Sequence, residues 1–446
     1  MGKIVLERKI SLLQATAINM TDMVGIGPFV VLSNVAELMK GPWFLYAWLA
    51  GAILSFVDAM IWSELGATFP LAGGTYNFLK ESFGLKWGRL MSFLFVWQTM
   101  IQAPLVIASA AIGFAQYLTY IIPLAPAEEK MVSGAVVVLI VFLLYRKIET
   151  VGRISVFLWL GVLITMTCII GGGLLHGNFL SPITHINDGL NLNEAFAATL
   201  GFASVKTMYS YLGYYNVCNL GGEIVKPEKN IPRSMFISVA GIAVLYTLMN
   251  ISVASVLPLQ TIVKSRFVVS DFMQTLAGPA AATIVTALLL WVAFASVFSG
   301  TLGYSRIPYA AARDGAFFSV FAKLHPVKHF PHVSLLALGS VAFVFSLLFK
   351  LSDVITAILA MRILIQFVGQ AMGLLILSKR RGRNFLKWRM PLFPVPVILA
   401  IFMWLYIFKS TSAKMAASGL LVIATGIIVY FLKARYNKEW PFKTEQ

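Results

Sequence analysis

The sequence is poor in charge, above all in acidic residues, and it contains very little cysteine. Charged residues make up 12% of its 446 residues, hydrophobic residues make up 59%, and the mean hydropathy is +0.83. A soluble globular domain carries about 25% charged residues, and a disordered chain is far less hydrophobic. The composition therefore excludes both classes and predicts a membrane protein.

The sequence also lacks the motifs of a membrane enzyme or a nucleotide-driven pump. It contains no G-x-x-x-x-G-K-[ST] loop, so ATP-driven transport has no support, and no H-E-x-x-H or similar metal cluster. The two cysteines, Cys168 and Cys218, lie in apolar runs and are predicted to be small core residues rather than redox or metal ligands. We therefore expect no enzyme activity, no metal and no cofactor.

Apolar runs of about 20 residues recur along the whole chain. A helix of that length crosses the hydrocarbon core of a bilayer, whereas barrel strands would show short alternating segments. The chain is therefore predicted to be an all-α integral membrane protein with twelve transmembrane helices. The predicted spans are 10–34, 42–69, 88–122, 131–147, 152–175, 195–223, 233–258, 280–306, 332–350, 353–378, 393–410 and 414–433.

The basic residues gather in the loops on one side of these spans. The chain has 35 Lys and Arg against 18 Asp and Glu, a formal net charge of +17. When the N-terminus is placed in the cytoplasm, most Lys and Arg fall in cytoplasmic loops, which is the asymmetry typical of multi-pass membrane proteins. This pattern argues against a nucleic-acid partner. It predicts a protein of the plasma or inner cell membrane with both termini cytoplasmic.

The first predicted span contains residues that should interrupt a transmembrane helix. Gly25, Gly27 and Pro28 follow the carboxylate of Asp22 inside an apolar run. In hydrocarbon, unwound backbone is tolerated only where it is buried in protein or lines a cavity. Such a break leaves a free half-helix N-terminus, which can hold an anionic group as it does in many secondary transporters.

The sixth predicted span carries a second interruption, five helices further along the chain. Residues 209–216 read Y-S-Y-L-G-Y-Y-N. Glycine permits positive φ and a close approach of ligand to the backbone. Paired interruptions in corresponding spans point to a transporter binding site, although glycines that let helices pack closely would look the same.

Five segments of the sequence carry motifs in a fixed order. They read V-G-I-G-P-F at 24–29, E-L-G-A-T-F-P-L-A-G-G-T-Y at 64–76, the aromatic–Gly–aromatic run with G-E and K-P-E-K-N-I-P-R at 209–233, S-R-I-P-Y-A-A-A-R-D-G with L-H-P at 305–326, and M-P-L-F-P at 390–394. Together they resemble the signatures of the amino acid–polyamine–organocation (APC) superfamily. The sequence is most similar to the amino acid permeases of that superfamily.

The resemblance implies a LeuT-like fold with a five-plus-five inverted repeat, in which helices 1 and 6 are discontinuous. Residues 1–446 would form a single transporter domain. Its first repeat would cover 10–175 and its second 195–378, while two further helices at 393–433 would lie outside the repeat.

If this fold is right, the substrate site lies between the two breaks. Freed N–H groups at the first break would face a carboxylate, and freed carbonyls at the second would accept from an ammonium. Ile26 stands where the family usually has Ser, and Pro28 removes a backbone donor. For the glutamines, hydrogen bonding between helices is an equally good explanation, and for each aromatic residue alone ordinary packing is the commoner one. The predicted substrate-binding residues are Asp22, Val24, Gly25, Ile26, Gly27, Gln98, Gln102, Ser210, Tyr211, Gly213, Tyr214, Trp291 and Phe294.

Ionisable and hydroxyl side chains inside the spans are candidates for coupling or gating. The helical rise separates Asp22 and Lys206 by roughly 12 Å along the membrane normal, which argues against a salt bridge. Several relatives carry in helix five a Lys that resembles a built-in substitute for a sodium ion, and Val162 takes that place here. Arg362 requires a partner or a water-filled cavity. The coupling and gating candidates are Asp22, Lys206, Glu223, Ser296 and Ser299, the two serines as oxygen ligands for Na⁺ or as helix-packing hydroxyls.

The predicted function is secondary active transport of amino acids by alternating access, coupled to protons or running as an exchange. As coupling ion, H⁺ is favoured over Na⁺. One alternative is a polyamine or organic-cation transporter, favoured by Asp22, and another is a transporter-like amino-acid sensor. The expected partners are a small-molecule amino acid or amine and the lipid bilayer. The sequence identifies no accessory subunit.

Overall fold

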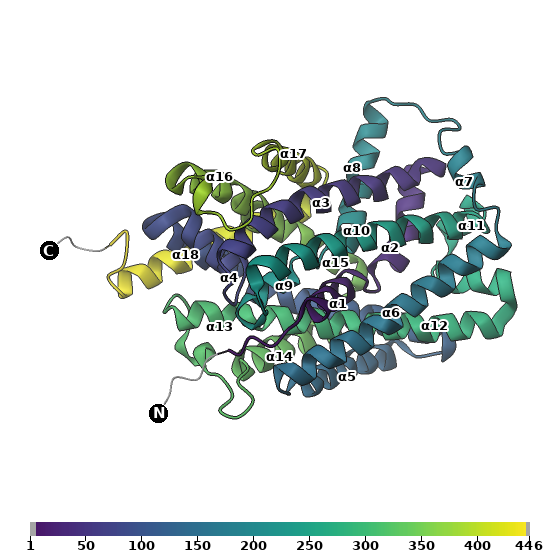
Figure 1. The fold of residues 1–446 in the computed structure, drawn as a ribbon. Coiled ribbons are helices and arrows are strands. Elements are labelled where there is room, and N and C mark those ends of the chain that lie inside the picture. Colours follow the sequence, from purple (N-terminus) through teal and green to yellow (C-terminus); the bar gives the residue numbers. More distant parts are fainter. Residues whose placement is uncertain (1–5, 443–446) are drawn as a thin grey trace.

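The computed structural model describes residues 6–442, except for the side chains of 352–354 and 356. The described chain is helical throughout, and its only strand-like pairings are the isolated bridges Ile10–Ile224 and Ala72–Leu220. Figure 1 shows the long helices running side by side along a common direction, with the connecting segments gathered at the two ends. The prediction of an all-α fold is therefore confirmed.

The helices follow one another closely along the chain. They are α1 (Leu12–Met23), α2 (Gly27–Met39), η1 (Pro42–Phe44), α3 (Leu45–Thr68), α4 (Thr75–Ile121), α5 (Pro126–Leu144), α6 (Ile148–His176), α7 (Ser181–Thr184), α8 (Glu194–Tyr211), α9 (Asn216–Asn219), η2 (Gly221–Glu223), α10 (Pro227–Ala254), α11 (Leu259–Lys264), α12 (Val268–Tyr304), α13 (Arg306–Arg313), η3 (Ser319–Ala322), α14 (His332–Leu348), α15 (Leu351–Arg362), the π-helix η4 (Ile363–Gly369), α16 (Gln370–Arg381), η5 (Arg383–Phe385), α17 (Val395–Lys409) and α18 (Ala413–Tyr436).

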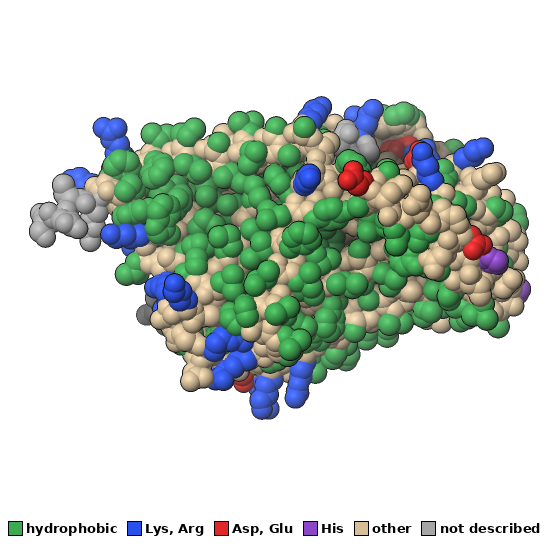
Figure 2. Space-filling view, turned by 90° about the horizontal axis from the view of Figure 1, so that it is seen from above, with side chains coloured by type: hydrophobic (Ala, Val, Ile, Leu, Met, Phe, Trp, Pro, Cys, Tyr) green, Lys and Arg blue, Asp and Glu red, His purple; other side chains and the backbone are tan. Residues whose placement is uncertain are grey.

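Helix occupies every range predicted as a span, but not every helix meets the requirements of a membrane span by itself. Among the described residues, seven helices are long and apolar enough to cross a bilayer, and the bent pair α1–α2 makes an eighth. The apolar helices α14 and α17 are shorter. Figure 2 shows hydrophobic side chains over most of one face, with many of the Lys and Arg side chains near its edges. The structure is thus that of a multi-pass membrane protein.

Both predicted breaks are present. The first separates α1 from α2 at residues 24–26, and the two helices meet at a bend of 42°. The second ends α8 at Tyr211, and helix resumes only at Asn216. Gly213 has φ +122°, a left-handed conformation that suits glycine and that L side chains rarely adopt.

The tenth predicted span contains a feature that the sequence did not reveal. Between α15 and α16 the chain passes through the π-helix η4, which begins directly after Arg362. A π segment inserts an extra residue into the helical register and often occurs at functional sites. It leaves Arg362 at the point where the register changes.

At the end of the bundle where the N-terminal segment begins, here called the terminal end, backbone hydrogen bonds and an ion pair join several elements. The N–H groups of Lys9 and Ile10 each donate to the carbonyl of Glu223 at 2.9 Å. The Glu223 carboxylate accepts from the Nε and Nη2 groups of Arg306, both at 2.9 Å, and the two side chains are at most 4% exposed. The opposite or far end carries α7 and α11 (Figure 1). The Glu223–Arg306 pair therefore ties η2 to α13 at the terminal end.

A buried carboxylate joins three parts of the bundle in its interior. Asp58 of α3 is 1% exposed and accepts from Trp62 at 2.8 Å, from Trp404 of α17 at 3.2 Å, and from the hydroxyl of Tyr214. Buried charge is tolerated when its lone pairs are satisfied in this way. Asp58 thus anchors the segment after the second break to α3 and α17.

Replacing Asp58 by Asn should destabilise the protein. The amide NH2 group of Asn cannot accept the hydrogen bond that a carboxylate oxygen now accepts, so one buried donor would lose its partner. The expected cost is about 1–3 kcal/mol of unfolding free energy, seen as a fall of a few degrees in the unfolding midpoint in detergent. Asp188→Asn, at a mostly exposed loop position paired with His185, is the matched control. An unchanged midpoint in Asp58→Asn would contradict the anchoring role.

Candidate functional site

The first break leaves two backbone donors without a partner. The N–H of Gly25 donates to Met23 O at 3.1 Å, and the N–H groups of Phe29 and Val30 turn back to Ile26 O. Within residues 6–442, no backbone hydrogen bond takes up the N–H groups of Ile26 and Gly27, which precede or begin α2. The positive end of the α2 dipole lies at the same place, so this point favours an anionic group.

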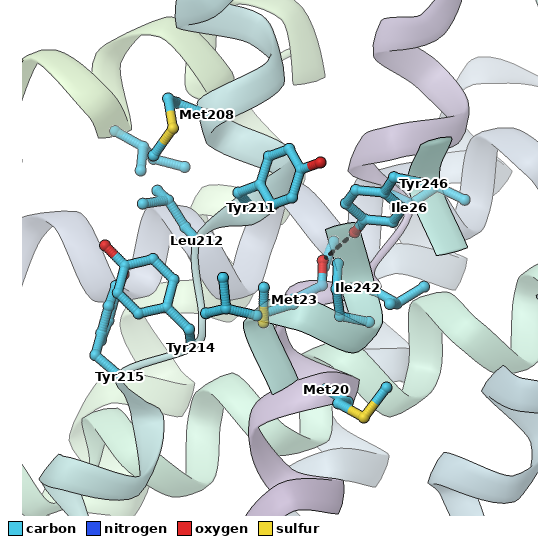
Figure 3. Close-up of a cluster of buried hydrophobic side chains, with 14 of the residues drawn as sticks. Met20, Met23, Ile26, Met208, Tyr211, Leu212, Tyr214, Tyr215, Ile242 and Tyr246 are labelled. Atoms are coloured by element: carbon cyan, nitrogen blue, oxygen red, sulfur yellow. Dashed lines mark hydrogen bonds between the residues drawn. The ribbon is translucent and has the colours of Figure 1, made fainter. Parts of the chain in front are cut away.

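A tyrosine from a third helix holds the two breaks together. The Tyr246 hydroxyl of α10 lies 2.8 Å from Met23 O at the first break and 3.0 Å from Ser210 O at the second, so its proton is shared between two carbonyls. Figure 3 shows Tyr246 beside Met23 and Ile26, with Tyr211 and Leu212 of the second break facing them. The packed cluster fixes the distance between the breaks.

A small cavity of about 40 Å³ lies where the breaks meet. At roughly 10–15 Å³ for each water position, it has room for about three waters. Its lining includes Asp22, Gly25, Ile26 and Gly27 of the first break, Ser210, Leu212, Gly213 and Tyr215 of the second, and Tyr209, Ser296, Tyr304 and Arg362 from the surrounding helices. One carboxylate and one guanidinium therefore border the same cavity.

Glycines let the walls of this cavity come together. A Cβ on Gly25 would lie 2.5 Å from Ser296 Oγ, and one on Gly27 would lie 2.8 Å from the Tyr209 ring. A Cβ on Gly213 would lie 2.7 Å from the backbone of Asp22 and Met23, where nothing can yield easily. A Cβ on Gly300 of α12, which packs beside Asp22, would lie 3.0 Å from Asp22 Oδ1. These close approaches explain the glycines better than general helix packing does.

The structure identifies the partners of Arg362, which the sequence alone could not name. Its Nη2 donates to the Tyr304 hydroxyl at 2.5 Å, and its Cζ lies 5.3 Å from the ring centre of Tyr215 and 5.5 Å from that of Tyr304. The two rings provide cation–π contacts with the guanidinium. No ion pair within 4.0 Å joins Asp22 to Arg362 in the described chain.

Several predicted site residues lie outside the cavity lining. Tyr214 is committed to Asp58, and Trp291 donates to Leu158 O at 3.0 Å and packs over Gly161. The remaining residues of this group are buried or half-buried in the helix packing around the site: Val24, Gln98, Gln102, Tyr211 and Phe294. The structure thus places at the cavity Asp22, Gly25, Ile26, Gly27, Ser210 and Gly213 of the predicted set.

The coupling and gating candidates fall in four different places. Ser296 lines the cavity, whereas Ser299 is buried and donates to Ile18 O at 2.8 Å beside Thr21. Lys206 borders a separate cavity of about 420 Å³ towards the far end, together with residues of α2, α4, α5 and α15. Glu223 belongs to the ion pair at the terminal end.

Sequence reasoning missed Tyr209, Tyr246 and Tyr304 as structural parts of the site. The hydroxyl of Tyr209 pairs with Ser109 at 2.9 Å beneath Gly27. A tyrosine within an apolar helix resembles ordinary packing, so only the tertiary contacts distinguish these three. Of these three, only Tyr209 could have been recognised from the sequence as a neighbour of the site, because it lies just before the second break.

Gly213→Ala should weaken ligand binding about tenfold or more, because the added methyl would push the two breaks apart. The measurement is the Kd of the amino acid that raises the unfolding midpoint most in a thermal-shift screen. Gly278→Ala is the matched control, since Gly278 has φ +80° but no atom within 4 Å of an added Cβ. Equal Kd values for the two variants would show that the binding site does not lie between the breaks.

Comparison with known proteins agrees with this architecture. The sequence profile described as "Amino acid permease" matches residues 10–432. The "Large neutral amino acids transporter small subunit 2" of Mus musculus is 27% identical over 97% of this chain and 82% of its own length. The "Asc-type amino acid transporter 1" of Mus musculus is 26% identical over 96% and 82%. The "Cystine/glutamate transporter" of Homo sapiens is 24% identical over 98% and 87%. The chain belongs to the amino acid permease family, within the APC superfamily that its motifs resemble.

Proposed function

We propose that the protein is a secondary transporter that moves amino acids across a membrane by alternating access, and that it is not an enzyme. The observation that carries the proposal is the cavity where two broken helices meet, with free amides at one break and an acid and a base in its wall. A zwitterion matches this arrangement, since its carboxylate can face the amides of Ile26 and Gly27 and its ammonium can face Asp22. Family membership supports the same substrate class.

We further propose the complete LeuT-like arrangement for this chain. It has twelve spans, a first repeat at 10–175, a second at 195–378, and two helices at 393–433 outside the repeat, all in one domain of residues 1–446. Supporting it, the breaks fall in the first and sixth predicted spans, which are equivalent positions in the two repeats. Helix also occupies each of the other predicted ranges.

A polyamine or organic cation is a weaker candidate substrate. Asp22 alone would favour an amine, but Arg362 borders the same cavity and would repel a second positive charge. A zwitterionic amino acid leaves the net charge of the cavity unchanged, whereas a polyamine carries at least one positive charge more than the single carboxylate of Asp22 can neutralise. The sensor alternative shares the binding site and differs only in the absence of translocation.

Two features support alternating access. The Glu223–Arg306 pair and the Ile10–Ile224 bridge of the N-terminal segment join elements at the terminal end. Towards the far end, the cavity of about 420 Å³ is lined by α2, α4, α8 and α15, which also line the small cavity one or two turns away. We assign the terminal end to the cytoplasm, with both termini on that side of the cell membrane.

For coupling, we propose protons or exchange in preference to Na⁺. A hard cation such as Na⁺ requires several oxygen ligands that are free to coordinate it. The Ser299 hydroxyl is already hydrogen-bonded to Ile18 O and lies 3.1 Å from Thr21 Oγ1. Asp22 is the candidate proton carrier, because it makes no hydrogen bond or ion pair with another described side chain and borders the cavity.

One relative is named as a small subunit, which raises the question of an accessory subunit for this chain. Cys168 lies in α6, and Cys218 is buried in α9. Neither thiol lies in a loop that a second protein could reach, so we propose that any such partner is bound without a disulfide.

Reconstituted vesicles test the proposed function directly. We expect uptake of at least one amino acid above the level of protein-free vesicles, increased by an inward proton gradient or by unlabelled amino acid inside. Replacing Na⁺ by choline should change nothing. Accumulation of putrescine or spermidine without any amino acid would overturn the substrate class. Binding without accumulation or exchange would establish the sensor alternative.

Glu223→Gln should loosen the terminal end, because it leaves the Arg306 guanidinium buried without its charged partner. In a Cys168→Ser background, buried Cys218 is the remaining thiol. Its labelling by a small maleimide should then be severalfold faster than with Glu223 intact. Glu149→Gln, which removes an exposed pair with Lys9, is the control. Equal labelling rates would show that the pair is not a gate.

A further inference from the structure

Arg362 brings more hydrogen-bond donors to the cavity than its neighbours accept. The side chain is 1% exposed, and a guanidinium has five N–H donors. Tyr304 accepts one of them, but the Nε and Nη1 atoms are buried and have no partner among the described residues. An unpaired buried donor costs about 1–3 kcal/mol, and more when the group is charged.

A second side chain of the cavity wall also has an unpaired polar atom. The Ser210 hydroxyl is buried without a hydrogen-bond partner among the described residues, and Ser210 lines the cavity with Arg362. Asp58, buried a short distance away behind Tyr214, has three donors. Arg362 and Ser210 thus keep unpaired polar atoms in the cavity wall, where a ligand can reach them.

Arg362 belongs to a different helix from the groups that suit a zwitterion. Asp22 and the amides of Ile26 and Gly27 belong to the first break, whereas Arg362 projects from α15, one helical turn beyond Ile358 towards the terminal end. If the first break holds the ammonium and carboxylate, as the proposed function states, Arg362 is left to contact the substrate's side chain.

We propose that Arg362 is a specificity-determining residue that donates to an oxygen on the side chain of the substrate. The protein then prefers amino acids with a hydroxyl, carboxamide or carboxylate side chain over aliphatic amino acids of similar size. A site with buried donors rejects an analogue that lacks the matching acceptor, because its own donors stay unpaired. This inference rests on the proposed function and narrows its substrate class.

The surroundings of Arg362 are suited to hold it in place. The Tyr304 hydroxyl fixes one end of the guanidinium, and the rings of Tyr215 and Tyr304 contact its faces. Directly after Arg362, the π-helix η4 changes the register of the backbone. A donor that is oriented before binding loses little conformational entropy when it pairs with a substrate.

Competition between matched amino acids tests the inference. Threonine and valine have the same shape, but only threonine has a hydroxyl. Asparagine and aspartate are compared with leucine, because they have a carboxamide and a carboxylate where leucine has methyl groups. For the unaltered protein in vesicles, we expect at least one oxygen-bearing member to compete about tenfold better than its aliphatic partner. The pair that shows the preference identifies the kind of oxygen.

The ratio between the competition by the oxygen-bearing amino acid and that by its aliphatic partner should fall to about one in Arg362→Met. In Arg362→Lys this preference should be partly retained. If Arg362→Met does not fold, Tyr304→Phe provides the second test, because losing the hydroxyl that orients Arg362 should reduce the preference severalfold. Arg383→Met, which removes an arginine paired with Glu64 at 2.5 Å outside the cavity, should leave the preference unchanged.

The outcomes separate this inference from the proposed function. If amino acids are transported but aliphatic and oxygen-bearing members compete equally, the inference is overturned and the transport function stands. A preference that survives in both Arg362→Met and Tyr304→Phe also overturns it. If no amino acid is bound or transported at all, the proposed function itself fails.

Discussion

The structure depends on one constraint: backbone that leaves the helical path within a membrane must find other partners. Here two helices break beside each other, and one side chain of a third helix serves both breaks. Tyr246 shares its proton between the carbonyls of Met23 and Ser210, and Gly213 lets the second break lie against the backbone of the first. The amides of Ile26 and Gly27 have no backbone partner in the part of the chain that the structure describes. Those unpaired donors are the reason that we propose the breaks as a binding site.

Two buried charges in this interior illustrate the difference between support and function. Asp58 has a donor on each oxygen and ties the second break to α3 and α17. Arg362 keeps two nitrogens without partners and borders the cavity. A fully satisfied charge stabilises a single arrangement, whereas a partly satisfied one lowers its free energy when a ligand arrives. By this rule Asp58 belongs to the framework, and Arg362 is the residue that we propose for recognition.

The sequence predicted the helical class and both breaks because glycine, proline and charge are unusual within an apolar run and can be recognised locally. It could not predict what depends on tertiary contacts. Tyr246 is indistinguishable from a packing residue until α10 is placed against both breaks. Arg362 was recognisable as a buried charge, but its partner Tyr304 lies on another helix. Trp291 was a reasonable wall residue, yet Gly161 gives its indole ring a place against α6 instead.

Amide hydrogen exchange, read by mass spectrometry, tests the central claim that the two breaks form one binding site. Adding a transported amino acid should slow exchange at 24–27 and at 210–215 together, because the ligand pairs the amides of the first break and fixes the second. Exchange in α18, which does not line the cavity, should not change. Protection at one break alone, or only at residues outside the cavity, would contradict the account.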